Sequence, residues 1–243
     1  MINDEPILAI IPARGGSKRI PKKNIKLFLG KPIISYSINA ALQSNLFDEV
    51  IVSTDDEEIA LLSKNLGANV PFKRSKINSN DYSSTADVIE EVLTKYRKMK
   101  PIDYKYFCCI YPTAPFLRKE KLHEALKLLI NNNADCVLPV MKYSYPIQRS
   151  LKIRDNNLKM LWPENYNKRS QDLEEIYHDA GQFYFMRTSS FKKEKKLFVE
   201  KSIPLIIDQI QGHDIDNSID WQVAEFKYKS NQKSKLTSDQ NEI

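Results

Sequence analysis

Two adjacent glycines in a cationic segment have the type and spacing to bind phosphate groups in this 243-residue chain. Segment 11–24 reads IPARGGSKRIPKKN, and its Gly15 and Gly16 let the backbone approach a ligand and turn N–H groups toward it. The side chains that add positive charge or a hydroxyl around them are Arg14, Ser17, Lys18 and Lys23. The combination predicts a triphosphate cradle, although it matches neither the Walker A pattern nor the GxGxxG fingerprint. The alternative interpretation is a solvated basic turn.

A pair of carboxylates near the other end of the chain suits a divalent metal ion. Asp214 and Asp216 are two positions apart, so on an extended segment they project from one face with their Cα atoms roughly 7 Å apart. Carboxylate oxygens at this spacing suit Mg²⁺, which keeps several waters and bridges phosphate oxygens. The alternative interpretation is a polar turn before a helix, because Asn217 and Asp220 form a helix start signal.

The elements that must position these groups alternate between apolar runs and amphipathic stretches. Such an alternation predicts an α/β three-layer sandwich, with a mainly parallel sheet covered by helices on both faces. The glycine turn then lies at the carboxyl end of the first strand, where α/β proteins bind ligands. The expected strands are 7–11, 50–53, 106–111, 136–140 and 182–187, with short ones at 70–72, 205–207 and 213–215. The expected helices are 32–42, 56–66, 84–96, 119–130 and 217–228.

The strand–helix pattern is interrupted once and fades at the end. Residues 142–177 are polar with scattered aromatics, which predicts an excursion from the sheet that serves as a flap, a subdomain or a dimer arm. Residues 192–196 are expected to form a very basic loop. One domain is expected over 1–228, followed by a flexible polar tail over 229–243.

The composition of the chain limits the classes of partner that are expected. The net charge of +6 is compatible with an anionic substrate or with a generally lysine-rich surface, and no aromatic-interleaved basic stripe indicates nucleic acid. The acidic start and the short apolar run 7–11 argue against a signal peptide and a membrane span. Cys108, Cys109 and Cys136 lie in apolar runs without CxxC spacing, which predicts buried thiols in a reducing cytoplasm.

Five segments in one order give a family resemblance that covers the chain from about residue 7 to residue 226. Besides the cradle, they are STDDEEI at 53–59, PFKR at 71–74, YPTAPFL at 111–117 and DID at 214–216. The chain resembles the acylneuraminate and Kdo-type cytidylyltransferases. The resemblance implies a Rossmann-like fold of the nucleotide-diphospho-sugar transferase type. It also implies Mg²⁺-assisted transfer of CMP from CTP to the anomeric hydroxyl of a nonulosonic acid.

The resemblance also implies roles for individual residues. Arg14, Lys18, Lys23 and Asp216 are expected to be catalytic, with Asp214 and Asp216 holding the metal. Arg74 and Asn24 are expected to read cytosine, although Arg74 has the alternative of an ordinary surface residue. Ser83, Ser84 and Thr85 are candidates for the ribose, or for helix caps. The residues expected to bind CTP are Arg14, Gly15, Gly16, Ser17, Lys18, Lys23, Asn24, Arg74 and Ser83.

Segments 145–149 and 169–184 resemble, within the family, the pseudaminic acid cytidylyltransferases. Legionaminic acid, N-acetylneuraminic acid and Kdo are the alternative acceptors. His178 is a candidate for substrate contact, a structural hydrogen bond or, less favoured, general base. Tyr111 stands where the family commonly has Gln. The residues expected to bind the sugar are Gln148, Arg149, Arg169, Gln171, Tyr177, His178, Gln182 and Tyr184. The resemblance also suggests a homodimer through 142–177.

Two other classes of protein share some of these features. A metal-dependent glycosyltransferase also uses an α/β sheet and a DxD pair, but its nucleoside diphosphate sugar has no terminal phosphates for a cationic cradle to hold. A non-catalytic nucleotide-binding module would bind CTP without turnover, and the acidic pair argues against it.

Overall fold

A single mixed sheet forms the centre of the computed structural model, which describes residues 5–240. Its strand order is β11-β6-β10-β5-β1-β4, and β9 pairs with β6 off this path. The pairs β1–β4, β1–β5 and β6–β11 are parallel, whereas β10 and β9 run antiparallel to their neighbours. The strands are β1 (Ile7–Pro12), β4 (Glu49–Ser53), β5 (Tyr106–Ile110), β6 (Cys136–Lys142), β9 (Tyr177–Asp179), β10 (Phe183–Arg187) and β11 (Ser202–Ile206).

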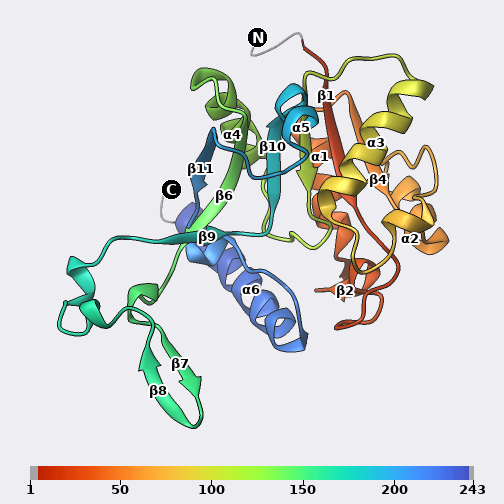
Figure 1. The fold of residues 1–243 in the computed structure, drawn as a ribbon. Helices are drawn as coiled ribbons and strands as arrows, with labels where there is room; N and C mark the ends of the chain where they lie inside the picture. Colours follow the sequence, from red (N-terminus) through yellow and green to blue (C-terminus); the bar gives the residue numbers. More distant parts are fainter. Residues whose placement is uncertain (1–4, 241–243) are drawn as a thin grey trace.

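Helices cover both faces of this sheet, so the predicted three-layer fold is confirmed (Figure 1). Side chains alternate along β1: Ile7, Ala9 and Ile11 join one buried cluster, while Leu8 and Ile10 join another. The first cluster includes α1 (Ile34–Ser44), α2 (Glu57–Asn65) and α4 (Lys119–Asn131), and the second includes α3 (Thr85–Met99) and α5 (Thr188–Glu194). Each face of the strand therefore meets its own helix layer.

Four local expectations differ from the structure. Residues 70–72 form no strand, since only a bridge between Ile51 and Asn69 occurs there, and 213–215 is a loop. In the expected basic loop 192–196, Lys192 and Lys193 instead belong to α5. The buried Phe191 anchors this part of the helix, while the lysines stay in solvent. The last helix, α6 (Ser218–Gln240), continues beyond 228 because no Gly or Pro interrupts it. No helix within residues 5–240 is both long and apolar enough to cross a membrane.

The three cysteines are buried and free, as predicted. Burial raises the pKa of each thiol, so these side chains behave as small core residues. Phe183 and Phe185 are likewise fully buried on β10.

The predicted excursion is an arm, defined here as residues 143–176, that extends away from the sheet (Figure 1). It contains a hairpin of β7 (Leu151–Arg154) and β8 (Asn157–Met160), preceded and followed by short 3-10 turns. On the hairpin, Ile153 pairs with Leu158, and both side chains are largely exposed. The arm therefore presents apolar surface to solvent at a distance from the core.

A smaller apolar cluster ties together loops from distant parts of the chain. It contains Ile20, Phe28, Phe116, Ile215 and Trp221, all buried. Phe28 lies in a small hairpin of β2 (Leu27–Phe28) and β3 (Lys31–Pro32), and its ring meets Trp221 edge-on at 5.7 Å. This satellite cluster packs the amino-terminal loop against the segment that carries the acidic pair.

Candidate nucleotide-binding site

The glycine turn leaves the carboxyl end of β1 beside the end of β4. The Gly15 N–H donates to the Asp55 carboxylate at 3.0 Å, and a β carbon on Gly15 would lie 2.7 Å from Asp56 Oδ2. Only glycine fits at this position. By contrast, a β carbon on Gly16 would meet nothing within 4 Å, so this part of the turn faces open space. The acidic segment that follows β4 therefore shapes the cradle.

Two of the predicted cations share one carboxylate. Arg14 Nη1 lies 2.9 Å from Asp81 Oδ1 and donates to the Asn80 carbonyl at 3.0 Å. Lys18 pairs with the other oxygen of Asp81, and its hydrogen bond is the first cause that lowers the pKa of this carboxyl. Sequence reasoning missed Asp81, because an aspartate in a polar loop carries no signal of its distant partners.

Lys23 joins the cradle to the acidic pair. Its Nζ donates to the Ile215 carbonyl at 2.7 Å and lies 3.9 Å from Asp216 Oδ1. Arg19, which sequence reasoning did not select, places Nη2 at 2.9 Å from the same Oδ1. Segments 14–23 and 214–216, which are distant in the sequence, therefore meet in one site.

Burial sets the charge balance at this junction. It is the main cause that lowers the pKa of Lys23, and carboxylates at Asp216 and Asp214 oppose it. Burial also raises the pKa of Asp214, with Asp216 adding like-charge repulsion. A cation placed between Asp214 and Asp216 would offset the repulsion between their carboxylates and favour the ionised form of Asp214.

A pocket of about 300 Å³ opens where the cradle cations gather. Larger hollows occur elsewhere on the described surface, but none of the cradle cations lines them. The pocket brings the cradle together with the segment that follows β5. Its lining residues are Pro12, Arg14, Ser17, Lys18, Arg19, Ile20, Lys23, Asn24, Thr85, Tyr111, Pro112 and Thr113.

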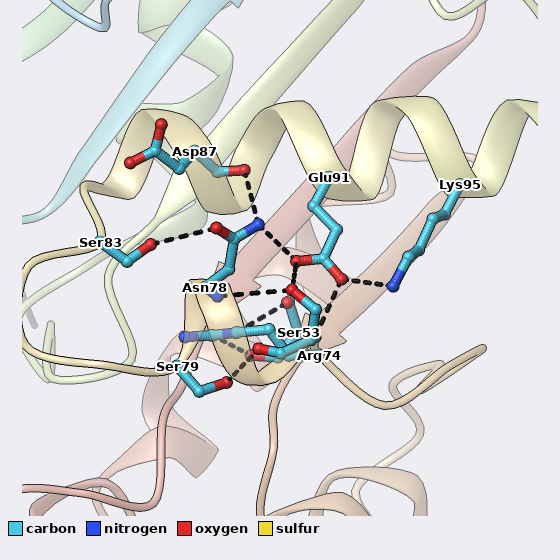
Figure 2. Close-up of polar contacts among 9 residues, drawn as sticks. Ser53, Arg74, Asn78, Ser79, Ser83, Asp87, Glu91 and Lys95 are labelled. Carbon is cyan, nitrogen blue, oxygen red and sulfur yellow. Dashed lines mark hydrogen bonds and ion pairs between the residues drawn. The ribbon is translucent and has the colours of Figure 1, made fainter.

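The two predicted cytosine readers are both buried. Arg74 is 5% exposed, so the alternative of an ordinary surface residue is wrong. Its Nε donates to Ser53 Oγ at 3.1 Å and its Nη2 donates to the Ser53 carbonyl, as Figure 2 shows. Burial lowers its pKa to about 10. Asn24 lines the pocket and donates from Nδ2 to the Arg14 carbonyl at 2.9 Å.

The candidates for the ribose separate by position. Ser84 is the N-cap of α3 and forms a capping box with Asp87, which confirms the cap interpretation for this residue. Ser83 lies in the preceding loop, where its Oγ donates to Asn78 Oδ1 at 3.4 Å (Figure 2). Thr85 lines the pocket.

A match to a known family decides what kind of protein carries this site. A family model described as "Cytidylyltransferase" matches residues 8–241. The chain belongs to the cytidylyltransferase family. A pseudaminic acid cytidylyltransferase of Campylobacter jejuni is 43% identical over 228 residues, which are 93% of this chain and 98% of that protein. A CMP-N,N'-diacetyllegionaminic acid synthase of Legionella pneumophila is 34% identical over 94% of this chain and 98% of its own.

The fold of this cytidylyltransferase also matches a solved nucleotidyltransferase. The structure of a CMP:2-keto-3-deoxy-manno-octonic acid synthetase complexed with CTP superposes with a TM-score of 0.67 and 17% identity. The match covers 94% of this chain and 99% of that one. The predicted Rossmann-like fold type is therefore confirmed.

The predicted sugar-binding residues fall into two groups in this cytidylyltransferase. Tyr177, His178, Gln182 and Tyr184 lie in or next to β9 and β10. His178 Nδ1 contacts the Asp179 carbonyl at 2.9 Å. Gln148, Arg149, Arg169 and Gln171 lie on the arm, which extends away from the sheet of its own chain.

The arm residues make local contacts. Gln148 Nε2 donates to the Glu174 carbonyl at 2.8 Å, and Arg169 Nε lies 2.7 Å from Asp172 Oδ2. Within one chain, the structure therefore does not bring this group together with the nucleotide pocket.

A tyrosine–aspartate network adjoins the acidic pair. Tyr184 donates its hydroxyl to Asp179, and its ring meets that of Tyr111 edge-on at 6.1 Å. Asp179 Oδ1 also accepts the Gly181 N–H at 2.8 Å, and a β carbon on Gly181 would lie 3.3 Å from Asp214 Oδ1. Tyr111, which lines the pocket, therefore lies between the nucleotide side and the first group of sugar candidates.

The acidic pair fits a magnesium ion that is shared with a substrate. Within residues 5–240, no cluster of three or more His, Cys, Asp or Glu side chains is arranged to hold a metal ion. Mg²⁺ is commonly bound by one or two carboxylates together with phosphate oxygens and waters. Asp214 and Asp216 would supply the carboxylates of such a site next to the cradle.

Proposed function

We propose that this family member transfers CMP from CTP to the anomeric hydroxyl of a nonulosonic acid, and that pseudaminic acid is the preferred acceptor. The observation that carries the proposal is the contact between the glycine cradle and the acidic pair through Lys23 and Arg19. The 43% identical pseudaminic acid cytidylyltransferase supports this acceptor. The 34% identical synthase makes legionaminic acid the first alternative, ahead of N-acetylneuraminic acid and Kdo.

The chemistry is an in-line displacement at phosphorus. The anomeric oxygen forms a bond to the α-phosphorus of CTP, the bond to the β-phosphate oxygen breaks, and pyrophosphate leaves while the hydroxyl loses its proton. Arg14, Lys18 and Lys23 bind the β- and γ-phosphates and offset the charge that builds on pyrophosphate. Mg²⁺ held by Asp214 and Asp216 would supply further positive charge at the phosphates.

Recognition of the base falls to Asn24 and Arg74. Cytosine offers O2 and N3 as acceptors and N4 as a donor. Asn24 has both an amide donor and an acceptor, and its side chain lines the pocket. The guanidinium of Arg74 has five N–H donors, so a side chain that already binds Ser53 retains capacity for a cytosine oxygen. Ser83 meets the ribose in this arrangement.

A second copy of the chain completes the sugar site. The apolar face of the β7–β8 hairpin carries Leu151, Ile153 and Leu158, each more than half exposed, and the opposite face carries Lys152 and Lys159. An apolar face of this kind on an extended arm is suited to association. A homodimer through the arm would place Arg149 and Arg169 near the partner's pocket, where they bind the sugar carboxylate.

Pyrophosphate release tests the proposal. The purified chain is incubated with CTP, Mg²⁺ and each of four acids: pseudaminic, legionaminic, N-acetylneuraminic and Kdo. We expect the highest kcat/KM with pseudaminic acid. A glycosyltransferase would release no pyrophosphate from CTP, and a binding module would bind CTP without turnover. Absence of pyrophosphate release with all four acids would contradict the proposal.

A further inference from the structure

We infer that Glu91 is a positioning residue that fixes the loop carrying Arg74 and Ser83, and thereby sets the affinity and base selectivity for CTP. This inference rests on the proposed function. Glu91 lies on α3 where the helix meets the 75–78 turn, and its side chain is only 7% exposed. A glutamate buried to this degree needs partners for both carboxylate oxygens.

Both oxygens of Glu91 are used, mainly by the turn that follows Arg74. Oε1 accepts the Ser75 N–H at 2.9 Å, while Oε2 accepts the Ser75 hydroxyl at 2.7 Å and Asn78 Nδ2 at 2.6 Å (Figure 2). Lys95, one helical turn further along α3, pairs with Oε1. One carboxylate therefore anchors the first and last parts of the 3-10 turn Lys76–Asn78.

The anchored turn restrains a residue on each side of it in the sequence, Arg74 before it and Ser83 after it. On one side, Ser75 is bonded directly to Arg74, whose N–H donates to the Thr54 carbonyl at 2.8 Å. On the other side, Asn78 Oδ1 accepts the Ser83 hydroxyl at 3.4 Å. Glu91 thus acts through Ser75 and Asn78 on the two residues proposed for cytosine and ribose.

The charge of Glu91 matters as well as its geometry. Burial is the largest effect and opposes ionisation, but hydrogen bonds from Lys95, Ser75 and Asn78 together outweigh it and lower the pKa to about 2. The carboxylate is therefore ionised at neutral pH. Burial lowers the pKa of Arg74, and the charges of Asp55 and Glu91 oppose that effect. Glu91 helps to keep the buried guanidinium charged.

Loss of this anchor weakens CTP binding without touching the reacting atoms. Without the Glu91 anchor, the 75–83 loop is less ordered before CTP binds. CTP must then order the loop, and the free energy needed for this weakens the observed affinity. Once bound CTP has ordered the loop, Asp81 again holds Arg14 and Lys18, so the chemical step proceeds at its former rate.

The test compares Glu91→Gln with the matched control Glu90→Gln. Glu90 is the neighbour on the same helix, and its carboxylate pairs with Lys195 at 2.6 Å. For Glu91→Gln we expect KM for CTP to rise roughly tenfold, as for loss of one charged hydrogen-bond set. We expect kcat and KM for the sugar to stay within about twofold, and selectivity for CTP over UTP to fall. Glu90→Gln should match the wild type.

Two further measurements keep the outcome decisive. Calorimetric titration with CTP gives the same comparison without turnover, so wild-type protein that binds CTP but releases no pyrophosphate contradicts the proposed function alone. Ser75→Ala removes one contact to Oε2 and serves if Glu91→Gln does not fold; we expect it to raise the dissociation constant for CTP in the same direction. An unchanged affinity for CTP in folded Glu91→Gln, or an equal loss of kcat with KM unchanged, would overturn the inference.

Discussion

At the scale of single residues, neighbours in the same loop have different surroundings. Lys23 is half-buried and reaches the acidic pair, whereas Lys22 points to solvent and pairs with Glu58 on α2. Gly15 is packed against Asp56, whereas Gly16 faces open space. Lys22 therefore offers a control for substitutions of the cradle cations, and Gly15 and Gly16 can be compared with each other.

Removal of charge from either side of the site should stop catalysis without unfolding the protein. We expect Arg14→Ala and Asp216→Ala each to lower kcat/KM at least ~100-fold, because each removes electrostatic stabilisation at the phosphates or the metal. Both side chains are more than one-third exposed, so the unfolding temperature should change little. Lys22→Gln is the control and should retain activity. Wild-type turnover in either alanine variant would contradict the assigned roles.

The two glycines should differ in what an added methyl group disturbs. Gly15→Ala would place its β carbon 2.7 Å from Asp56 Oδ2 and should lower the free energy of unfolding by about 1–3 kcal/mol. Gly16→Ala has room, so its stability should match the wild type, while its methyl group occupies space that faces the phosphates. Urea unfolding and CTP titration of both variants distinguish these effects. Equal stability of the two variants would show that the Asp56 contact is not limiting.

At the scale of elements, sequence periodicity predicted most of the framework. The alternation along β1 and the apolar stripes of α1 to α4 each place a buried face correctly, because burial imposes a period of 2 or 3.6 residues. The cradle and the acidic pair could also be proposed from the sequence, since the residues of each lie close together in it. The sequence did not predict the β7–β8 hairpin of the arm, because a solvent-exposed hairpin lacks the buried face that produces a periodic pattern.

Partners that are distant in sequence could not be predicted in the same way. Arg74 and Ser53 are 21 positions apart, and Arg14 and Asp81 are 67 apart. Glu91 looks in the sequence like one more acidic residue on the solvated side of a helix. Only the packing of the 75–78 turn against α3 covers its carboxylate, so its role depends on tertiary structure.

The anchor on α3 has a pH signature. The folded-state pKa of Glu91 is about 2, below its ordinary value of 4.5, so its stabilisation is fully present above pH 4.5 and is lost as pH falls toward 2. The free energy of unfolding of wild type should exceed that of Glu91→Gln by an amount on the order of 3 kcal/mol at pH 7. Urea unfolding at pH 7, 4 and 3 should show this difference shrinking. A constant difference would contradict the assignment of the charge.

At the scale of the whole molecule, the arm is the segment through which we propose that two copies assemble. Ile153→Asp places a charge on the apolar face of the hairpin, and we expect it to shift sedimentation from dimer to monomer because a buried unpaired carboxylate is costly. Lys152→Ala on the opposite face is the control and should leave the dimer intact. Since arm residues are proposed to complete the partner's sugar site, the monomer should retain CTP binding but lose sugar turnover. A wild-type protein that sediments as a monomer would contradict the proposed assembly.

The satellite cluster around Ile20, Phe116 and Ile215 has a consequence for synthesis on the ribosome. Because Ile215 and Trp221 follow every strand of the central sheet in the sequence, the nascent chain can complete that sheet while the cradle still lacks its packing with these two residues. Competence to bind nucleotide should therefore arise only after the sheet has formed. Stalled chains that have emerged from the tunnel only as far as residue 213 should resist protease over the sheet and still fail to retain CTP.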